Sequence, residues 1–251
     1  MSLRSVYVEA PSFQNERLHL SGDEHRHLTV ARAQPGEVIE VFDGRGNVWT
    51  AAIESVNKRE TIARITTSRT VKPPSIELIL GMALIRIAAF ELALEKAVEV
   101  GVTRIVPFNA ARSNVAEGNR HDRWMRIIVE AAKQSKHYYI PKLDLSTSFT
   151  EVLSLPASSK IVFVERGGGP LKAGLSGSPV LYLIGPEGGW TDEELALAKR
   201  AGFIPASLGE GILKAETAAI VGAALTGYEL GRGLKPASGN PMENYPVNRL
   251  N

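Results

Sequence analysis

The chain has 251 residues, of which 44% are hydrophobic and 22% charged, and its formal net charge is +2. This length and composition allow one large or two modest globular domains, and so small a net charge argues neither for nor against a nucleic-acid partner. The absence of cysteine excludes disulfides, thiolate catalysis and cysteine-bound zinc, and it fits the reducing cytoplasm, where we expect the protein to act.

Residues 1–72 predict a small β-rich domain. Runs in which apolar and polar residues alternate predict strands at 5–9, 38–42, 48–53 and 61–66. The segment Asp43-Gly44-Arg45-Gly46 between two of these runs is typical of a β-hairpin, and residues 23–33 predict one short helix. The pattern favours a small β-barrel, which ends where Pro73 and Pro74 break the chain.

Residues 73–236 predict a second domain in which strands and helices alternate. The expected strands are 76–85, 103–107, 161–164, 180–184 and 204–208, and the expected helices are 90–100, 120–136, 192–201 and 216–230. Such alternation implies an α/β fold with a mostly parallel sheet covered by helices on both faces. The most apolar stretch, 78–90, is interrupted by Arg86 and is too short to cross a bilayer, so no membrane association is expected. Residues 237–251 are rich in Pro and Asn and predict a loose tail.

A locally basic band runs from residue 112 to residue 142. It contains seven Lys and Arg residues but only three acidic ones, and Tyr138, Tyr139, His121 and His137 lie among them. Such a band is typical of surfaces that follow phosphates and stack bases, but it is equally typical of a solvated helix face. Both interpretations stay open at this stage.

Two glycine-containing loops predict one small-molecule site. The first, Gly185-Pro186-Glu187-Gly188-Gly189, follows the strand 180–184 and precedes a helix that begins on a capping box of Thr191 and Glu194. The second, 208–218, follows the next strand. Loops of this kind expose backbone to a ligand at the carboxyl ends of parallel strands. Neither contains the dinucleotide fingerprint or a Walker lysine, so nicotinamide cofactors and nucleoside triphosphates are disfavoured.

Several polar residues near these loops are candidates for chemistry. Lys214 lies just before the helix 216–230, where a cation is unfavourable unless an anion binds there. A helix start alone would account for Glu216 or Thr217 at this place, but not for Lys214. The pair Arg112-Ser113 follows the strand 103–107 and lies at the ligand edge of the sheet or is ordinary surface. The histidines at 19, 25 and 27 have no partner at metal-ligand spacing, so no metal site is expected.

Further stretches along nearly the whole chain match one family. They are His25-Arg26-His27-Leu28, Val30-Ala31-Arg32, the hairpin 38–46, the segment 94–102, Arg112-Ser113 and Ala131-Ala132-Lys133-Gln134-Ser135. Together with the two loops, which are specific to the family, these stretches resemble the bacterial 16S ribosomal RNA uridine N3-methyltransferases, small-subunit methyltransferase E of the SPOUT superfamily. The resemblance implies a PUA-like RNA-binding domain over 1–72 and a SPOUT domain with a deep trefoil knot over 73–236. It also implies a homodimer that acts on 16S ribosomal RNA or the small ribosomal subunit.

The resemblance also implies S-adenosylmethionine as methyl donor and assigns residues to it. The donor would contact residues of the two loops, namely Leu183, Ile184, Gly185, Pro186, Glu187, Gly188, Gly189, Leu208, Gly209, Ile212, Leu213, Thr217 and Ala218. The RNA would contact Arg26, Arg32, Arg112, Ser113, Gln134, Lys136 and His137. The chain departs from the family at Lys214 and His137, where arginine is usual, and at Arg86, where lysine is usual.

The chemistry expected of this family assigns roles to four charged residues. Uridine N3 must lose its proton before it attacks the methyl group, and the resulting negative charge spreads onto the flanking carbonyl oxygens. Arg112 and Lys214 are the candidates for stabilising that charge, and Glu187 or Glu216 for taking the proton. Three alternatives remain: a SPOUT enzyme that methylates another atom, an inactive RNA-binding assembly factor, and a nucleotide-dependent oxidoreductase.

Overall fold

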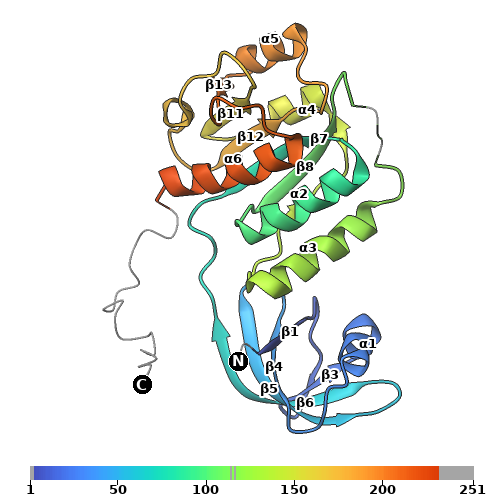
Figure 1. Cartoon of the computed structure of the whole chain (residues 1–251). Helices are drawn as coiled ribbons and strands as arrows, with labels where there is room; N and C mark the ends of the chain where they lie inside the picture. The colour runs from blue at the N-terminus through green and yellow to red at the C-terminus, as the bar shows by residue number, and fades with distance from the viewer. Residues whose placement is uncertain (1–2, 114, 116, 232–251) are drawn as a thin grey trace, which may run out of the picture.

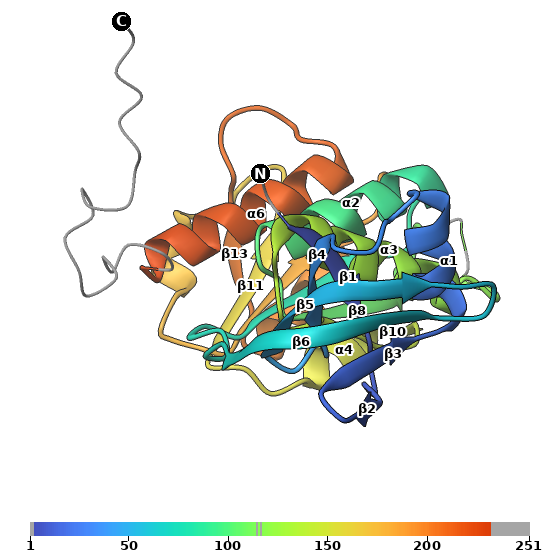
Figure 2. The ribbon, with the colours of Figure 1, turned by 90° about the horizontal axis from the view of Figure 1, so that it is seen from below.

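The computed structural model describes residues 3–113, 115 and 117–231, so the predicted tail 237–251 lies outside the described residues. The chain forms two parts, an N-terminal domain built on one sheet and a larger C-terminal α/β domain (Figure 1). Seen from below, the N-terminal sheet lies in front of helix α3 and the larger domain (Figure 2). Among the described residues, no helix combines the length and the apolar character needed to cross a membrane.

The N-terminal domain contains a six-stranded mixed sheet and one helix. The strand order is β1-β4-β5-β6-β3-β2, in which β1 and β4 are parallel and the other pairs antiparallel. The elements are β1 (Arg4–Tyr7), β2 (Phe13–Gln14), β3 (Arg17–Leu20), α1 (Gly22–Val30), β4 (Val38–Phe42), β5 (Asn47–Val56) and β6 (Thr61–Thr70). The predicted hairpin between β4 and β5 is confirmed, and Asp43 closes it by accepting hydrogen bonds from the backbone of Arg45 and Asn47.

The C-terminal domain is built on a seven-stranded sheet in which every described strand pair is parallel, as predicted. The order is β10-β8-β7-β12-β11-β13, and β9 pairs with the other end of β8. The strands are β7 (Leu78–Ala83), β8 (Arg104–Asn109), β9 (Lys142–Leu143), β10 (Thr147–Ser148), β11 (Ser159–Phe163), β12 (Val180–Ile184) and β13 (Ile204–Ala206).

Helices cover both faces of this sheet because the central strands are apolar on both sides. Leu78, Leu80 and Met82 of β7 join the core beneath α2 (Ile87–Glu99), α3 (His121–Ser135) and α6 (Ala215–Glu229). Ile79 and Ala83, which point the other way, join the core beneath α4 (Phe149–Ser154) and α5 (Asp192–Arg200). The short 3₁₀ helix η1 (Leu171–Gly174) completes the described elements.

The two domains are joined through the segment that follows α3. The backbone N–H of Gly46 donates to the carbonyl of Tyr138, and the N–H of Ile140 donates to the carbonyl of Gly44. Glu40 of β4, whose side chain is only 12% exposed, accepts hydrogen bonds from Lys136 Nζ and from the Tyr138 hydroxyl, both at 3.0 Å. Residues 136–140, the part of the basic band that follows α3, therefore contribute to packing between the domains.

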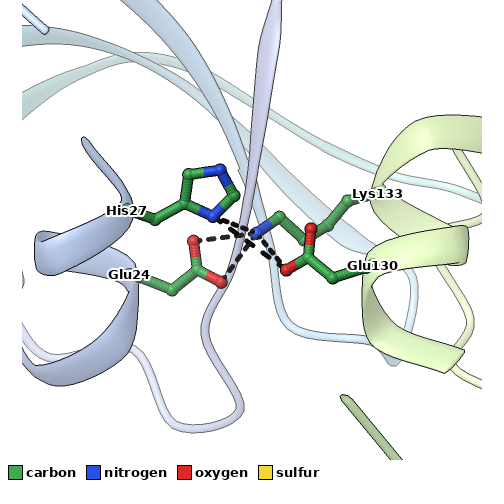
Figure 3. Close-up of polar contacts among 4 residues, drawn as sticks. All are labelled: Glu24, His27, Glu130 and Lys133. Atoms are coloured by element: carbon green, nitrogen blue, oxygen red, sulfur yellow. Dashed lines mark hydrogen bonds and ion pairs between the residues drawn. The ribbon is translucent and has the colours of Figure 1, made fainter. Parts of the chain in front are cut away.

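A buried lysine makes a second connection between the domains. Lys133 on α3 is 3% exposed, and its Nζ donates to Glu24 of α1 at 3.0 Å and to Glu130 at 2.9 Å, with His27 Nδ1 3.3 Å away (Figure 3). Burial raises the pKa of the Glu24 carboxyl, and the nearby Lys133 only partly offsets that effect. The junction thus contains a desolvated ion pair whose members depend on each other.

Candidate functional site

A cavity of about 650 Å³ opens at the carboxyl ends of the parallel strands. Five segments line it, one after each of β7, β8, β11, β12 and β13. Strand β12 is fully buried and delivers the loop 185–190 to this edge, as is usual for ligand sites in parallel α/β sheets. The volume lies within the range of small-molecule pockets.

The loop after β12 brings bare backbone into the cavity because Trp190 folds back over Gly185. A Cβ atom added at Gly185 would lie 2.8 Å from the indole ring, so no larger residue fits without moving Trp190. The Trp190 Nε1–H donates to the carbonyl of Phe163 at 2.9 Å, and its ring stacks on Phe108 with an interplanar angle of 8°. The tryptophan is held from both sides, and the loop has little freedom to relax.

The opposite wall is formed by residues 207–213 and the first turn of α6. The Ser207 hydroxyl donates to the carbonyl of Gly209 at 2.8 Å and shapes this loop. Lys214 is the N-cap residue of α6 but makes no side-chain cap, and Glu216 follows in the first helical turn. Neither Lys214 nor Glu216 makes a side-chain hydrogen bond or ion pair with a residue that the structure describes, although the charge of Glu216 helps to raise the pKa of Arg86. Both side chains therefore remain available to a ligand.

Three other charged residues of the cavity, Arg86, Arg112 and Glu187, already have partners. Arg112 Nη1 donates to the carbonyl of Gly188 at 2.7 Å and ties the loop after β8 to the loop after β12. Arg86 Nε lies 2.6 Å from Glu187 Oε1, and this hydrogen bond raises the pKa of the Arg86 guanidinium. Among the described residues, the cavity therefore has three charged side chains with partners and four without a hydrogen bond or ion pair, namely Glu165, Arg166, Lys214 and Glu216.

The structure brings most of the predicted donor and catalytic residues together. Arg112, Glu187, Lys214 and Glu216 all line the cavity, and so do all the predicted donor-binding residues apart from Leu183 and Thr217. The Leu183 side chain is buried in the core between the sheet and helices α4 and α5. The predicted donor residues left out several lining residues, chiefly Val164, Glu165 and Arg166 after β11, and Trp190, Ser207 and Gly211 in or beside the two predicted loops. The strand 161–164, which ends at that loop, was the available signal for the first three.

The predicted RNA-binding residues do not gather at one place. Arg112 lines the cavity, whereas the Ser113 hydroxyl closes a turn by accepting from the N–H of Ala110. Lys136 and His137 line a second cavity, of about 640 Å³, beside the linker 71–77. Lys136 Nζ donates within the chain to Leu3, Ser5 and Glu40, and His137 lies 3.2 Å from the carbonyl of Glu99. Gln134 is exposed on α3, and Arg26 and Arg32 are exposed in and just after α1.

Over residues 3–113, 115 and 117–231, no three His, Asp or Glu side chains gather in a way that could hold a metal ion. His25 instead bonds to Thr61, and His19 Nδ1 lies 2.9 Å from Glu60. These histidines thus have structural partners in the N-terminal domain.

Both domains of the chain match families of RNA methyltransferases. An RNA methyltransferase domain family matches residues 72–227, and an RNA methyltransferase PUA domain family matches residues 20–66. The chain is 33% identical over 206 residues to the ribosomal RNA small subunit methyltransferase E of Synechocystis sp., covering 78% of this chain and 68% of that protein. It is 32% identical over 202 residues to the protein of the same name from Mesomycoplasma hyopneumoniae, covering 77% of this chain and 86% of the relative.

Solved structures also resemble the fold over nearly its full length. A ribosomal RNA small subunit methyltransferase E from Neisseria gonorrhoeae, crystallised with S-adenosyl methionine, aligns with a TM-score of 0.84 and 29% identity, covering 90% of this chain and 98% of that one. A methyltransferase from Legionella pneumophila in complex with the same cofactor aligns with a TM-score of 0.85 and 27% identity, covering 91% and 98%.

Proposed function

Because the chain belongs to the ribosomal RNA small subunit methyltransferase E family, we propose that it methylates N3 of a uridine in 16S ribosomal RNA. It is a methyltransferase that uses S-adenosylmethionine and acts on ribosomal RNA of the small subunit. The uridine N3 atom is the specific part of the proposal. The observation that carries it is the cavity formed by the two glycine-containing loops, with unpaired Lys214 and Glu216 on its wall.

The residues of the cavity fit a sulfonium nucleoside. The space suits a ligand of that size, and Gly185 presents backbone where any side chain would meet Trp190. Ile184, Leu208, Ile212 and Leu213 supply apolar surface for an adenine ring. We propose that these residues hold the donor mainly through backbone and apolar contacts.

When bound, S-adenosylmethionine supplies an electrophilic methyl group, so the protein must orient uridine and help its N3 lose a proton. Of the two predicted acceptors, Glu216 is our choice because it lies in the first turn of α6 without a hydrogen bond or ion pair, whereas Glu187 is already paired with Arg86. Lys214 is our choice of cation for the charge that develops on the uracil carbonyls. Arg112 donates to the carbonyl of Gly188, so its main role in this proposal is to hold the loop after β12 in place.

Three further parts of the proposal concern assembly and surroundings. We infer that the chain divides near residue 72 into a PUA-like RNA-binding domain (1–72) and a SPOUT domain (73–236) that contains a trefoil knot. The family resemblance, the linker 71–77 and the separate sheets support that division. We also infer a homodimer and a cytoplasmic location, where ribosomal subunits are processed. Exposed Leu225 and Tyr228 on α6 offer apolar surface for a second copy.

The test is to incubate the protein with labelled S-adenosylmethionine and with small ribosomal subunits, or their free RNA, that lack the modification. Digestion and mass mapping should place the label on N3 of one uridine. Label on a ribose 2′-oxygen or on guanine N1 would retain the methyltransferase and replace the target atom. Donor binding without transfer to any RNA would contradict the proposal.

A further inference from the structure

Glu194 is a buried carboxylate that joins two loops of the cavity without lining it. It is the third residue of α5 and is only 5% exposed. Its Oε2 accepts from the backbone N–H of Thr191 at 2.9 Å, and its Oε1 accepts from the backbone N–H of Ala111 at 2.8 Å. The first contact belongs to the capping box of α5, and the second reaches a loop 83 residues earlier in the chain.

The contact with Ala111 fixes the residue that precedes Arg112. The turn from Ala110 to Ser113 is closed by the Ser113 N–H, which donates to the carbonyl of Ala110 at 3.0 Å. Arg112 then extends to the carbonyl of Gly188 at 2.7 Å. The loop after β8 and the loop after β12 are therefore joined twice, once by the Arg112 side chain and once by the carboxylate of Glu194.

A second capping box in the same chain shows what capping alone requires. Ser148 and Glu151 form it at the start of α4, and Glu151 hydrogen-bonds only to Thr147 and Ser148 within the same turn. Glu151 is exposed, whereas Glu194 is buried and reaches a distant loop. Since burial of a carboxylate is unfavourable unless its oxygens are hydrogen-bonded, the buried bridge of Glu194 goes beyond what the helix needs.

We propose that Glu194 is a positioning residue for methyl transfer, which holds the loop bearing Arg112 at a fixed separation from the loop that binds the donor. This inference rests on the proposed function of the cavity. Glu194 does not line the cavity, so its removal acts on the alignment of Arg112 and Gly188. Donor affinity should change less, because Trp190 also holds the loop after β12 through Phe108 and Phe163, and residues 208–213 form the other wall.

The test compares four variants of the full-length protein in methyl transfer to small subunits. Glu194→Gln places an amide N–H₂ against one of two backbone donors, and Glu194→Asp keeps the charge but is too short to reach Ala111. Both should lower kcat about tenfold or more, the effect of losing one charge-assisted hydrogen bond, while calorimetric Kd for S-adenosylmethionine changes less than about threefold. Thr191→Ala weakens the same cap, and Glu151→Ala removes the side chain that completes the other one; both should keep kcat within about twofold of wild type.

A double-mutant cycle with Arg112→Ala supplies the second readout. If Glu194 acts through Arg112, adding Glu194→Gln to Arg112→Ala should lower kcat by less than about threefold further. Full additivity, or a kcat of Glu194→Gln equal to that of Thr191→Ala at matched melting temperature, would overturn the inference. Absence of methyl transfer by the wild-type protein would instead overturn the proposed function, and this inference with it.

Discussion

The ammonium of Lys133 on α3 lies 3.0 Å from the carboxylate of Glu24 on α1, inside the junction between the two domains. Lys133 is 3% exposed, so each member of the pair is the main reason that the other tolerates burial. A change of one member alone should therefore affect stability far more than a change of both.

Lys133→Met should destabilise the protein by about 3 kcal/mol at pH 7, because Glu24 stays buried without its counter-charge. Adding Glu24→Gln should recover most of that loss. Since burial raises the pKa of Glu24 in the folded state, ionisation of Glu24 lowers stability as the pH rises through that pKa. The loss caused by Lys133→Met should therefore shrink in mild acid, where Glu24 takes up its proton. Urea unfolding of the wild type, of Lys133→Met and of the double variant at pH 7 and pH 5 measures this. Equal losses of stability in the single and double variants would refute it.

Glu40→Gln should also weaken the junction by an amount that falls in acid, but for a different reason, because the pKa of Glu40 is lowered in the folded state. Burial would raise the pKa of Glu40, but hydrogen bonds from Lys136, Tyr138 and Arg69 outweigh burial and lower it. A lowered folded-state pKa contributes stability that is present above the unfolded value, near 4.5, and is lost as the pH falls through the folded value. We expect a loss of about 2 kcal/mol at pH 7 that diminishes below pH 4.5, measured by urea unfolding across this range. A loss that stays constant with pH would contradict the role of the charge.

Gly185→Ala should weaken binding of S-adenosylmethionine about tenfold or more, because its Cβ would lie 2.8 Å from an indole that is held by Phe108 and Phe163. Gly169→Ala is the matched control, since a Cβ there meets only the Pro205 carbonyl at 3.8 Å and Gly169 lies outside the cavity lining. Calorimetric titration of both variants decides the question. Equal affinities would mean that the donor does not approach Gly185.

Glu216→Gln should lower the rate of methyl transfer by about a hundredfold or more if Glu216 takes the N3 proton, while donor affinity changes little. Glu187→Gln should have a smaller effect, because the Glu187 carboxylate is paired with Arg86. Single-turnover transfer to small subunits compares the two. Near-normal turnover of Glu216→Gln would remove this assignment and return Glu187 as the candidate.

Much of the fold follows from local patterns in the sequence. The strand 180–184 is confirmed to the residue because a fully buried central strand is one continuous apolar run between turn residues. Strands β2, β9 and β10 have two residues each and β3 has four, which pair with β2 and β6, so their patterns are too short to predict. Helix α4 was missed although its capping box, Ser148 with Glu151, was present in the sequence.

The candidate site divides along the same line. The loop 185–189 and the residues 208–218 are predictable because their composition is unusual over a short stretch. The contacts of Arg112 with Gly188 and of Glu194 with Ala111 join residues 76 and 83 positions apart, and they exist only because β7 places β8 and β12 near each other. No spacing along the chain encodes such contacts. Lys136 illustrates the converse: its place in a basic stretch predicts RNA binding, and nothing local predicts that it donates to three groups within the chain.

The backbone hydrogen bonds of Tyr138 and Ile140 with Gly44 and Gly46 hold the N-terminal sheet against the segment that follows α3. The distance between that sheet and the cavity is then set by the fold. An RNA that binds the N-terminal domain would have to bend to bring its target nucleotide to the cavity. The shape of the RNA away from the target would then contribute to substrate selection before the target base is bound.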